Sequence, residues 1–232
     1  MPIISTQGLT KIYNERIVPV TALNNVSLDF DAGEFTAIIG PSGSGKTTLL
    51  NMLGGLDKPT SGNITINGLE ITGMKENRLM DYRLRNIGFV FQSYNLIPVL
   101  TAIENVSFIM LLQKQPRNVI EKRAIELLEQ VGLSDRIHSR PGELSGGQQQ
   151  RVAVARALAS KPNYVLADEP TANLDTKSAF TLLDIMEKLN HEEKITLIFS
   201  THDQRVIERA RRVITLVDGT VTTDIPVEKQ QV

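Results

Sequence analysis

The sequence has no cysteine, no long apolar run and almost no net charge. Without cysteine the chain forms neither disulfides nor thiolate metal sites, which agrees with a reducing cytosol. A formal net charge of −1 at pH 7 gives no overall positive field, so no nucleic-acid partner is expected. No stretch approaches the roughly 18 to 20 apolar residues of a membrane span, and no signal peptide is expected. Any membrane association is therefore expected to run through a partner protein.

The composition does supply enough apolar material for a full core. The chain has 232 residues, of which 41% are hydrophobic and 22% are charged. These fractions are ordinary for a globular protein. The length corresponds to one large domain, or to a core that carries an inserted subdomain.

The most informative stretch is a glycine-rich loop that fits the phosphate-loop pattern G-x-x-x-x-G-K-[ST]. It lies between an apolar, β-branched run at 35–39, typical of a buried strand, and a helix opening at 49–53. Its residues are Gly40, Pro41, Ser42, Gly43, Ser44, Gly45, Lys46 and Thr47, with Thr48 directly after them. In such a loop backbone N–H groups converge on a phosphate, Lys46 reaches the β- and γ-phosphates, and the Thr47 hydroxyl binds Mg²⁺. The sequence therefore predicts a site for a nucleoside triphosphate with magnesium.

Strands are predicted around this loop. Residues 3–30 favour strands, and apolar side chains alternate with polar ones near the end of this range, as in a half-buried antiparallel strand. A further strand at 62–68 is closed by an Asn-Gly turn. A polar helix follows it, to about Arg85.

Two side chains near these strands have two interpretations each. Tyr13 is either an exposed aromatic that stacks on a nucleobase or a tyrosine packed in the core. Gln92 follows the strand predicted at 86–91, where it either reaches a metal or a water, or lies solvated in a loop. The local sequence does not decide either case.

Residues 96–160 show helical periodicity and no clear strand. One amphipathic helix is indicated by apolar residues spaced i, i+4, i+7, i+8 and i+11, namely Ile120, Ala124, Leu127, Leu128 and Val131. The pattern predicts an α/β protein in which a helical insertion separates two strand-rich portions.

A second candidate anion site lies inside this insertion, at 144–151. Ser145 is predicted to cap a helix that runs to about Ser160, and Gly146 and Gly147 expose N–H groups at its start. One triphosphate does not need two such sites on one chain, so this site makes sense if it serves the nucleotide of another copy. A simple cap and turn is the alternative.

Two carboxylates end the apolar strand predicted at 163–169. A buried parallel strand brings its carboxyl end to the nucleotide crevice. There Asp168 can hold Mg²⁺, directly or through water, and Glu169 can address a water in line with the γ-phosphate.

The last third of the chain continues the α/β pattern. Asp175 leads into a helix that is predicted to end at about Leu189. The next strand, 194–199, brings His202 to the expected nucleotide edge, although a lone histidine is more often structural. A hairpin is predicted at 212–223.

Together these motifs resemble, in order and over nearly the whole chain, the ATP-binding subunit of an ABC transporter. Residues 40–47 are similar to the Walker A loop, 165–168 to the end of Walker B, and 144–148 to the family signature, which is the most specific of the three. The resemblance implies a P-loop NTPase core with a mainly parallel sheet, an N-terminal antiparallel β subdomain and an inserted helical subdomain.

The resemblance also implies domain limits and roles. The nucleotide-binding core with its β subdomain comprises 1–95 and 160–232, and the helical subdomain comprises 96–159. The phosphate loop with Thr48 binds ATP, Tyr13 stacks on adenine, and the signature pins the γ-phosphate held by the opposite subunit. The catalytic residues so implied are Glu169, His202 and Gln92; the Mg²⁺ ligands are Thr47, Gln92 and Asp168; the signature and D-loop contacts are Ser145, Gly146, Gly147, Gln148 and Asp175. The D-loop, 172–175, reads Ala-Asn-Leu-Asp, whereas Ser-Ala-Leu-Asp is the commonest form.

A narrower resemblance points to one group of these ATPases. Residues 91–106 and 170–175 are similar to the ATPases of lipoprotein-release and of macrolide- or peptide-efflux systems. This implies an ATPase that dimerises on ATP and drives separate permease subunits, on the cytoplasmic side of the cell membrane. The resemblance also allows for a periplasmic or extracellular accessory protein.

Two other functions compete with this one. A soluble ABC ATPase that acts in assembly, for example of iron–sulfur clusters, shares all of the motifs but has no permease. The surface around 92–110 separates the two, because the apolar run 96–100 with Ile103 favours a partner groove, with core packing as the alternative. A P-loop kinase is disfavoured by the signature.

Overall fold

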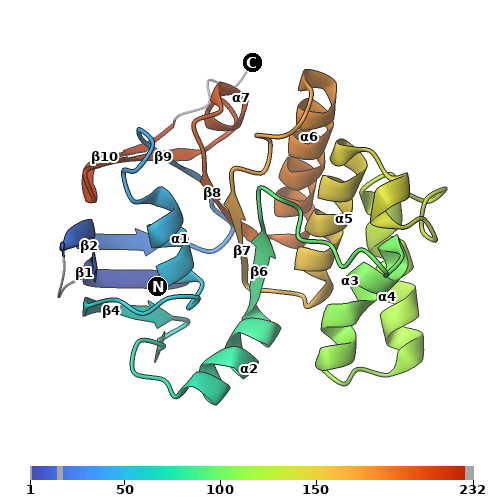
Figure 1. Cartoon of the computed structure of the whole chain (residues 1–232), viewed down its shortest axis with the longest axis horizontal. Coiled ribbons are helices and arrows are strands. Elements are labelled where there is room, and N and C mark those ends of the chain that lie inside the picture. Colours follow the sequence, from blue (N-terminus) through green and yellow to red (C-terminus); the bar gives the residue numbers. More distant parts are fainter. Residues whose placement is uncertain (1, 15–17, 228–232) are drawn as a thin grey trace. The chain divides into compact units, whose positions relative to one another are not determined.

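The computed structural model describes residues 2–14 and 18–227, which fall into two compact units (Figure 1). The first unit combines Met1–Asp81 with Thr196–Val232, and the second unit is Tyr82–Ile195. Residues 15–17, within the range predicted as strands, lie outside the described part of the chain. The predicted helical subdomain, 96–159, falls within the second unit, and its limits stay a prediction.

An antiparallel sheet forms the N-terminal part of the first unit, as predicted. Its strand order is β2-β1-β4-β5. In β2 the apolar side chains predicted to face inward are buried, while most of their neighbours in the strand are exposed, so one face of the strand packs on the core. The strands are β1 (Ile4–Tyr13), β2 (Val20–Phe30), β4 (Ser61–Ile66) and β5 (Leu69–Glu70).

The first unit also contains the strands that carry the phosphate loop. They lie in the order β10-β9-β3-β8, and β3 is parallel to both of its neighbours. Because parallel strands end at the same edge, the carboxyl ends of β3 and β8 lie together. The rings of Phe35 and Phe199 stack at 4.6 Å and join the two strands. The strands are β3 (Phe35–Ile39), β8 (Thr196–Ser200), β9 (Arg212–Val217) and β10 (Thr220–Pro226).

Several strand limits differ from the predicted ones, and those of β8 and β10 differ the most informatively. The strand predicted from Lys194 begins at Thr196, because Lys194 has a φ of 55° and ends the preceding helix in the left-handed conformation. The return strand of the final hairpin runs beyond the predicted 223, to Pro226. Proline fits there because β10 is the last strand in the order and needs no further backbone donor.

The helices of the first unit are short. α1 (Lys46–Leu53) follows the phosphate loop, and α7 (Gln204–Ile207) follows β8. The sequence pattern did not reveal α7, since four residues carry no periodicity. α2 (Glu76–Asn86) begins in the first unit and ends in the second, close to the predicted end at Arg85.

The second unit consists of two parallel strands and most of the helices. Residues 96–160, all of them described, contain helices and no strand, as predicted. Helices α3, α4 and α5 pack on one another (Figure 1). The elements are β6 (Ile87–Val90), β7 (Tyr164–Asp168), α3 (Ala102–Leu112), α4 (Arg117–Gln130), the 3₁₀ helix η1 (Pro141–Glu143), α5 (Gly146–Ala159) and α6 (Thr176–Glu193).

Two of these helices test the predicted patterns. The apolar residues predicted for one face of α4 are buried, which confirms the amphipathic helix. Helix α6 runs past the predicted end at Leu189 to Glu193, because Lys194 rather than a proline or glycine terminates it. Of the described residues, none belongs to a helix with the length and apolar character that crossing a bilayer requires.

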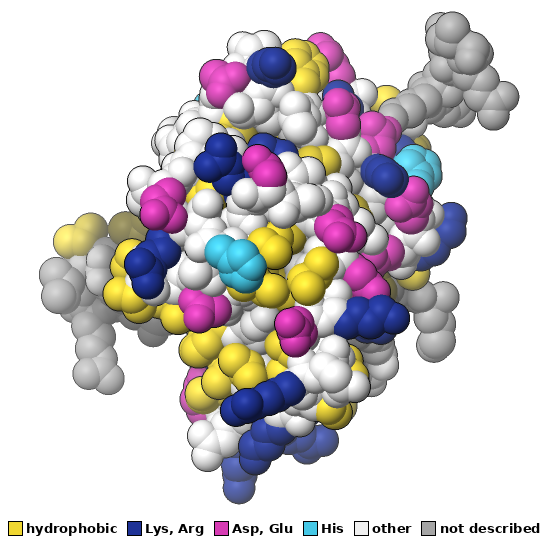
Figure 2. Space-filling model, turned by 90° about the vertical axis from the view of Figure 1, so that its right-hand side faces the viewer, with side chains coloured by type: hydrophobic (Ala, Val, Ile, Leu, Met, Phe, Trp, Pro, Cys, Tyr) yellow, Lys and Arg dark blue, Asp and Glu magenta, His cyan; other side chains and the backbone are white. Residues whose placement is uncertain are grey.

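The surface carries charges of both signs. On the face shown in Figure 2, acidic and basic side chains are intermixed over most of the area, and Lys and Arg gather at its lower end. This distribution agrees with the small net charge of the whole sequence.

Candidate nucleotide-binding site

The phosphate loop joins the end of β3 to the start of α1 in the first unit. The helix begins at Lys46, and its N-cap is Gly45, which has a φ of 102° and provides no side-chain cap. An α-helix begins with backbone N–H groups that have no partner inside the helix, and its N-terminus attracts anions. The loop therefore offers a phosphate the backbone donors that a capping side chain would otherwise take.

Two side chains inside the loop suit a phosphate ligand. Lys46 is 9% exposed, and its Nζ donates to the carbonyls of Gly40 and Pro41, at 2.9 Å each. These bonds hold the ammonium group within the loop. The Ser44 hydroxyl is buried and has no hydrogen-bond partner among the described residues. A buried hydroxyl without a partner costs free energy, and a bound phosphate oxygen would remove that cost.

The loop geometry predicts which of its glycines are irreplaceable. A Cβ on Gly40 would lie 2.0 Å from the Leu216 carbonyl oxygen, whereas a Cβ on Gly43 would meet nothing within 4 Å. Both glycines have positive φ angles, so alanine is strained at either position. We expect Gly40→Ala to lower the free energy of unfolding by at least about 2 kcal/mol. The matched control, Gly43→Ala, should lower it by about 1 kcal/mol. Urea denaturation would measure both, and equal losses would contradict the close approach.

Tyr13 ends β1, and the residue is 36% exposed. Its hydroxyl donates to Asp57 Oδ2 at 2.8 Å, and Lys11 Nζ, which also bonds Asp57, lies 4.8 Å from the ring centroid. Partial burial, and then the bond to Asp57, raise the pKa of Tyr13. Of the two interpretations of this residue, the structure favours the exposed ring. The contact with Asp57 had no signal in the sequence, because 44 residues separate the two.

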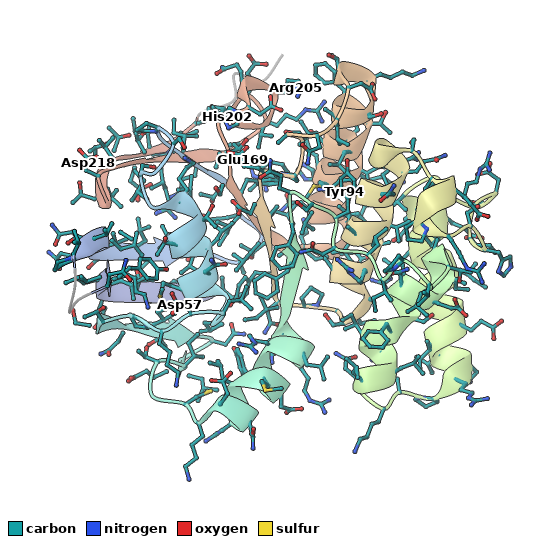
Figure 3. All side chains as sticks on the ribbon, viewed as in Figure 1. Asp57, Tyr94, Glu169, His202, Arg205 and Asp218 are labelled. Atoms are coloured by element: carbon teal, nitrogen blue, oxygen red, sulfur yellow. The ribbon has the colours of Figure 1, made fainter. Side chains whose placement is uncertain are left out.

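His202 lies shortly after the end of β8, and its side chain is exposed (Figure 3). The neighbouring Thr201 N–H donates to the Ile38 carbonyl at 3.0 Å. This bond holds the chain beside the end of β3, from which the phosphate loop departs. The first unit thus contains the phosphate loop, Tyr13 and His202, and it places the residue before His202 beside the end of β3.

The two predicted carboxylates lie in the second unit. Asp168 is the last residue of β7, and Glu169 follows it with a φ of 45°. Both side chains are partly buried. A non-glycine residue at positive φ is uncommon and is often found at functional sites. The turn is closed by the Ala172 N–H, which donates to the Glu169 carbonyl at 3.2 Å.

Gln92 and the D-loop are joined in the second unit. Gln92 lies beyond β6, which ends at Val90, earlier than the predicted strand. Its side chain is exposed, and its carbonyl accepts a hydrogen bond from Asn173 Nδ2 at 3.0 Å. Asp175 caps α6 through bonds from the side chain and backbone N–H of Ser178, which lower the pKa of Asp175.

The signature stretch begins α5 in the second unit. Ser145 is the N-cap, as predicted: its Oγ accepts from the Gln148 N–H, and its own N–H donates to Gln148 Oε1 at 2.8 Å. A Cβ on Gly146 would lie 2.8 Å from the Tyr94 hydroxyl, and one on Gly147 would lie 2.7 Å from Ser178 Oγ. A side chain at either position would therefore force the facing side chain to move. The structure shows the predicted cap, and the anion site at this helix start stays a prediction.

Comparison with known proteins decides the family. The sequence profile of the family described as "ABC transporter" matches residues 23–172. The chain belongs to the ABC transporter family. It is 52% identical over 211 residues to an uncharacterized ABC transporter ATP-binding protein of Thermotoga maritima, covering 91% of this chain and 90% of that protein.

Two further relatives have functional names. The cassette is 48% identical to the lipoprotein-releasing system ATP-binding protein LolD 1 of Chlorobium chlorochromatii, covering 90% of this chain and 85% of that protein. It is 44% identical to the macrolide export ATP-binding/permease protein MacB of Hyphomonas neptunium, covering 96% of this chain but only 34% of MacB. The predicted resemblance to this group is confirmed.

A solved structure has the same fold. The dimeric ATP-binding cassette MJ0796, in a post-hydrolysis state bound to ADP and Pi, matches with a TM-score of 0.90 and 41% identity, over 98% of this chain and all of that one. This match confirms the predicted ABC ATPase fold, with its mainly parallel sheet, antiparallel β part and helical insertion.

Proposed function

We propose that this cassette is the ATP-hydrolysing subunit of a transporter whose permease is a separate chain. The observation that carries the proposal is the phosphate loop, in which Lys46 is held between two carbonyls and the buried Ser44 hydroxyl has no partner among the described residues. Both features suit the β- and γ-phosphates of ATP. The family membership makes ATP the expected triphosphate.

Hydrolysis is assigned to the residues at the strand ends. Glu169 would orient and deprotonate the attacking water, and His202 would contact the γ-phosphate. The oxygen donors of Thr47, Gln92 and Asp168 are the kind that Mg²⁺ prefers. Magnesium, when bound, neutralises charge on the β- and γ-phosphates. The products are ADP and phosphate, and Tyr13 would stack on the adenine.

We propose further that two copies of the cassette enclose two ATP molecules. Support comes from the second helix start, where Ser145, Gly146, Gly147 and Gln148 lie at the N-terminus of α5. These residues and Asp175 would complete the site on a second copy. The similar cassette MJ0796, whose structure is dimeric with ADP and Pi, gives a precedent.

The subgroup suggests what the transporter does. Relatives named for lipoprotein release and macrolide export support extrusion of a lipoprotein, peptide or drug. The cassette would then lie at the cytoplasmic side of the cell membrane, held there by its permease. A periplasmic or extracellular accessory protein is proposed on the same grounds.

The permease contact has a candidate surface in the loop before α3. Val99 is 71% exposed there. The loop is fixed by the buried Asn105, whose amide bonds the backbone of Ile97, Leu100 and Thr101. A rigid loop that presents an apolar side chain suits a docking partner. The exposed Val99 supports the partner surface that the apolar run 96–100 predicts.

A co-purification experiment tests the permease. We expect the tagged cassette, extracted from membranes of its own organism in mild detergent, to carry a polytopic membrane protein with it. Val99→Asp should reduce the recovery of that protein at least about fivefold, because a buried charge would be left in the contact. Val119→Asp, at a half-exposed apolar position on α4, is the matched control and should have no effect. A cassette found only in the soluble fraction would favour the assembly function instead.

A further inference from the structure

The segment that contains Gln92 is fastened through its backbone carbonyls. Residues 91–95 follow β6, and side chains from elsewhere in the second unit donate to most of their carbonyl oxygens. The bonds run from Gln150 to Phe91 (3.4 Å), from Asn173 to Gln92 (3.0 Å), from Arg156 to Tyr94 (2.8 Å) and from Arg156 to Asn95. A loop held in this way is fixed by its neighbours rather than by secondary structure of its own.

Two of these donors connect the segment to the residues after Glu169. Gln150 is fully buried, and its Nε2 donates to the Pro170 carbonyl at 2.9 Å as well as to Phe91. Asn173 is exposed and belongs to the D-loop itself. Two amide side chains, those of Gln150 and Asn173, therefore join residues 91–92 to residues 170–173.

We propose that Asn173 is a positioning residue that couples Gln92 to Asp175. The bond holds the backbone of Gln92, and Asn173 stands two residues before the N-cap of α6. A displacement of Gln92 is passed through this bond to Asp175. The expected effect on ATP turnover rests on the proposed function. The positioning of Gln92 by the hydrogen bond does not depend on that function. The commonest D-loop has alanine at this place, which cannot donate such a bond.

The expected kinetic effect is on kcat. Asn173 bonds a backbone carbonyl, so its loss should leave KM for ATP within about twofold. A hydrogen bond between neutral groups corresponds to a change of about 2- to 10-fold, and we expect kcat to fall by that factor in Asn173→Ala. Asn173→Asp keeps the shape of the side chain but removes the N–H donor. Its kcat should fall by at least the same factor. Asn118→Ala, at an exposed asparagine of α4, is the matched control.

A distance measurement tests the coupling without any nucleotide. The chain has no cysteine, so spin labels can be attached at Ser93→Cys and Lys177→Cys, both exposed positions, without a background. We expect the distribution of the label–label distance to be narrow with Asn173 and clearly broader with Asn173→Ala or Asn173→Asp. Asn118→Ala should leave it unchanged.

The outcomes separate this inference from the proposed function. Unchanged distances in both Asn173 variants overturn the inference, and so do broadened distances with an unchanged kcat. A chain with the native Asn173 that does not hydrolyse ATP overturns the proposed function, while the spin-label distances still decide whether Asn173 positions Gln92 against the D-loop.

Discussion

In saturating MgATP, the Glu169→Gln cassette is expected to form a stable dimer that does not turn over. Glutamine keeps the shape and the hydrogen bonding of glutamate but cannot take a proton from the attacking water. Removal of a general base slows a reaction by about 10²- to 10⁴-fold. ATP would therefore persist in the site and hold the two copies together. Phosphate release and static light scattering measure the two effects on the same sample.

The dimer prediction has its own controls. With ADP, Glu169→Gln should remain a monomer, because no γ-phosphate bridges the copies. Adding Ser145→Arg places a large cation at the exposed N-cap of α5 and should block dimerisation, while ATP binding to the monomer stays within about threefold. A persistent monomer of Glu169→Gln at saturating MgATP would count against the sandwich, and a normal hydrolysis rate would remove Glu169 from its role.

Lys46→Ala is expected to lose tight ATP binding. The ammonium group is held at the phosphate loop by the carbonyls of Gly40 and Pro41, and alanine leaves those carbonyls without their donor. Charge-assisted bonds to phosphate are among the strongest hydrogen bonds in proteins, so Kd should rise by about 10- to 100-fold or more. Titration with a fluorescent ATP analogue measures the change.

An exposed lysine of the same unit provides the comparison. Lys75→Ala removes the same charge from a surface position before α2 and should leave Kd unchanged. Thermal unfolding of both variants shows whether the loop remains folded, because Lys46 also supports it. If Lys46→Ala and the native chain bound ATP with equal affinity, the assignment of the phosphate loop as the ATP site would be wrong.

Much of the fold could be predicted because its signals are local. A few residues are enough to predict each of three elements. Apolar alternation predicts β2, an apolar run predicts β3, and the spacing of Ile120, Ala124 and Leu127 predicts α4. The phosphate loop and the signature combine glycines with a lysine or a serine at fixed spacing. The roles of these residues in catalysis stay predictions.

The remainder depended on contacts between distant residues. Nothing near Lys194 predicts that it ends α6, because a positive φ is uncommon for any residue other than glycine. The bond between Tyr13 and Asp57 and the bond between Asn173 and Gln92 join segments far apart in the chain. The left-handed φ of Glu169 is likewise set by the turn around it. The unusual asparagine of the D-loop was visible in the sequence, but its partner was not.

The capping box at the start of α5 bears on how quickly a second nucleotide can be captured. The Ser145 oxygen already accepts the Gln148 N–H, and its backbone N–H is satisfied by the Gln148 side chain. The hydroxyl proton of Ser145 remains free to rotate, and it is exposed. In the proposed dimer, an incoming γ-phosphate would meet a hydroxyl donor on a backbone that is already ordered, so few groups would lose conformational freedom on binding. The rate of dimer formation should then be limited by the encounter of the two copies and not by a rearrangement of residues 144–148. We therefore expect the dimer to close fast and to open only after hydrolysis.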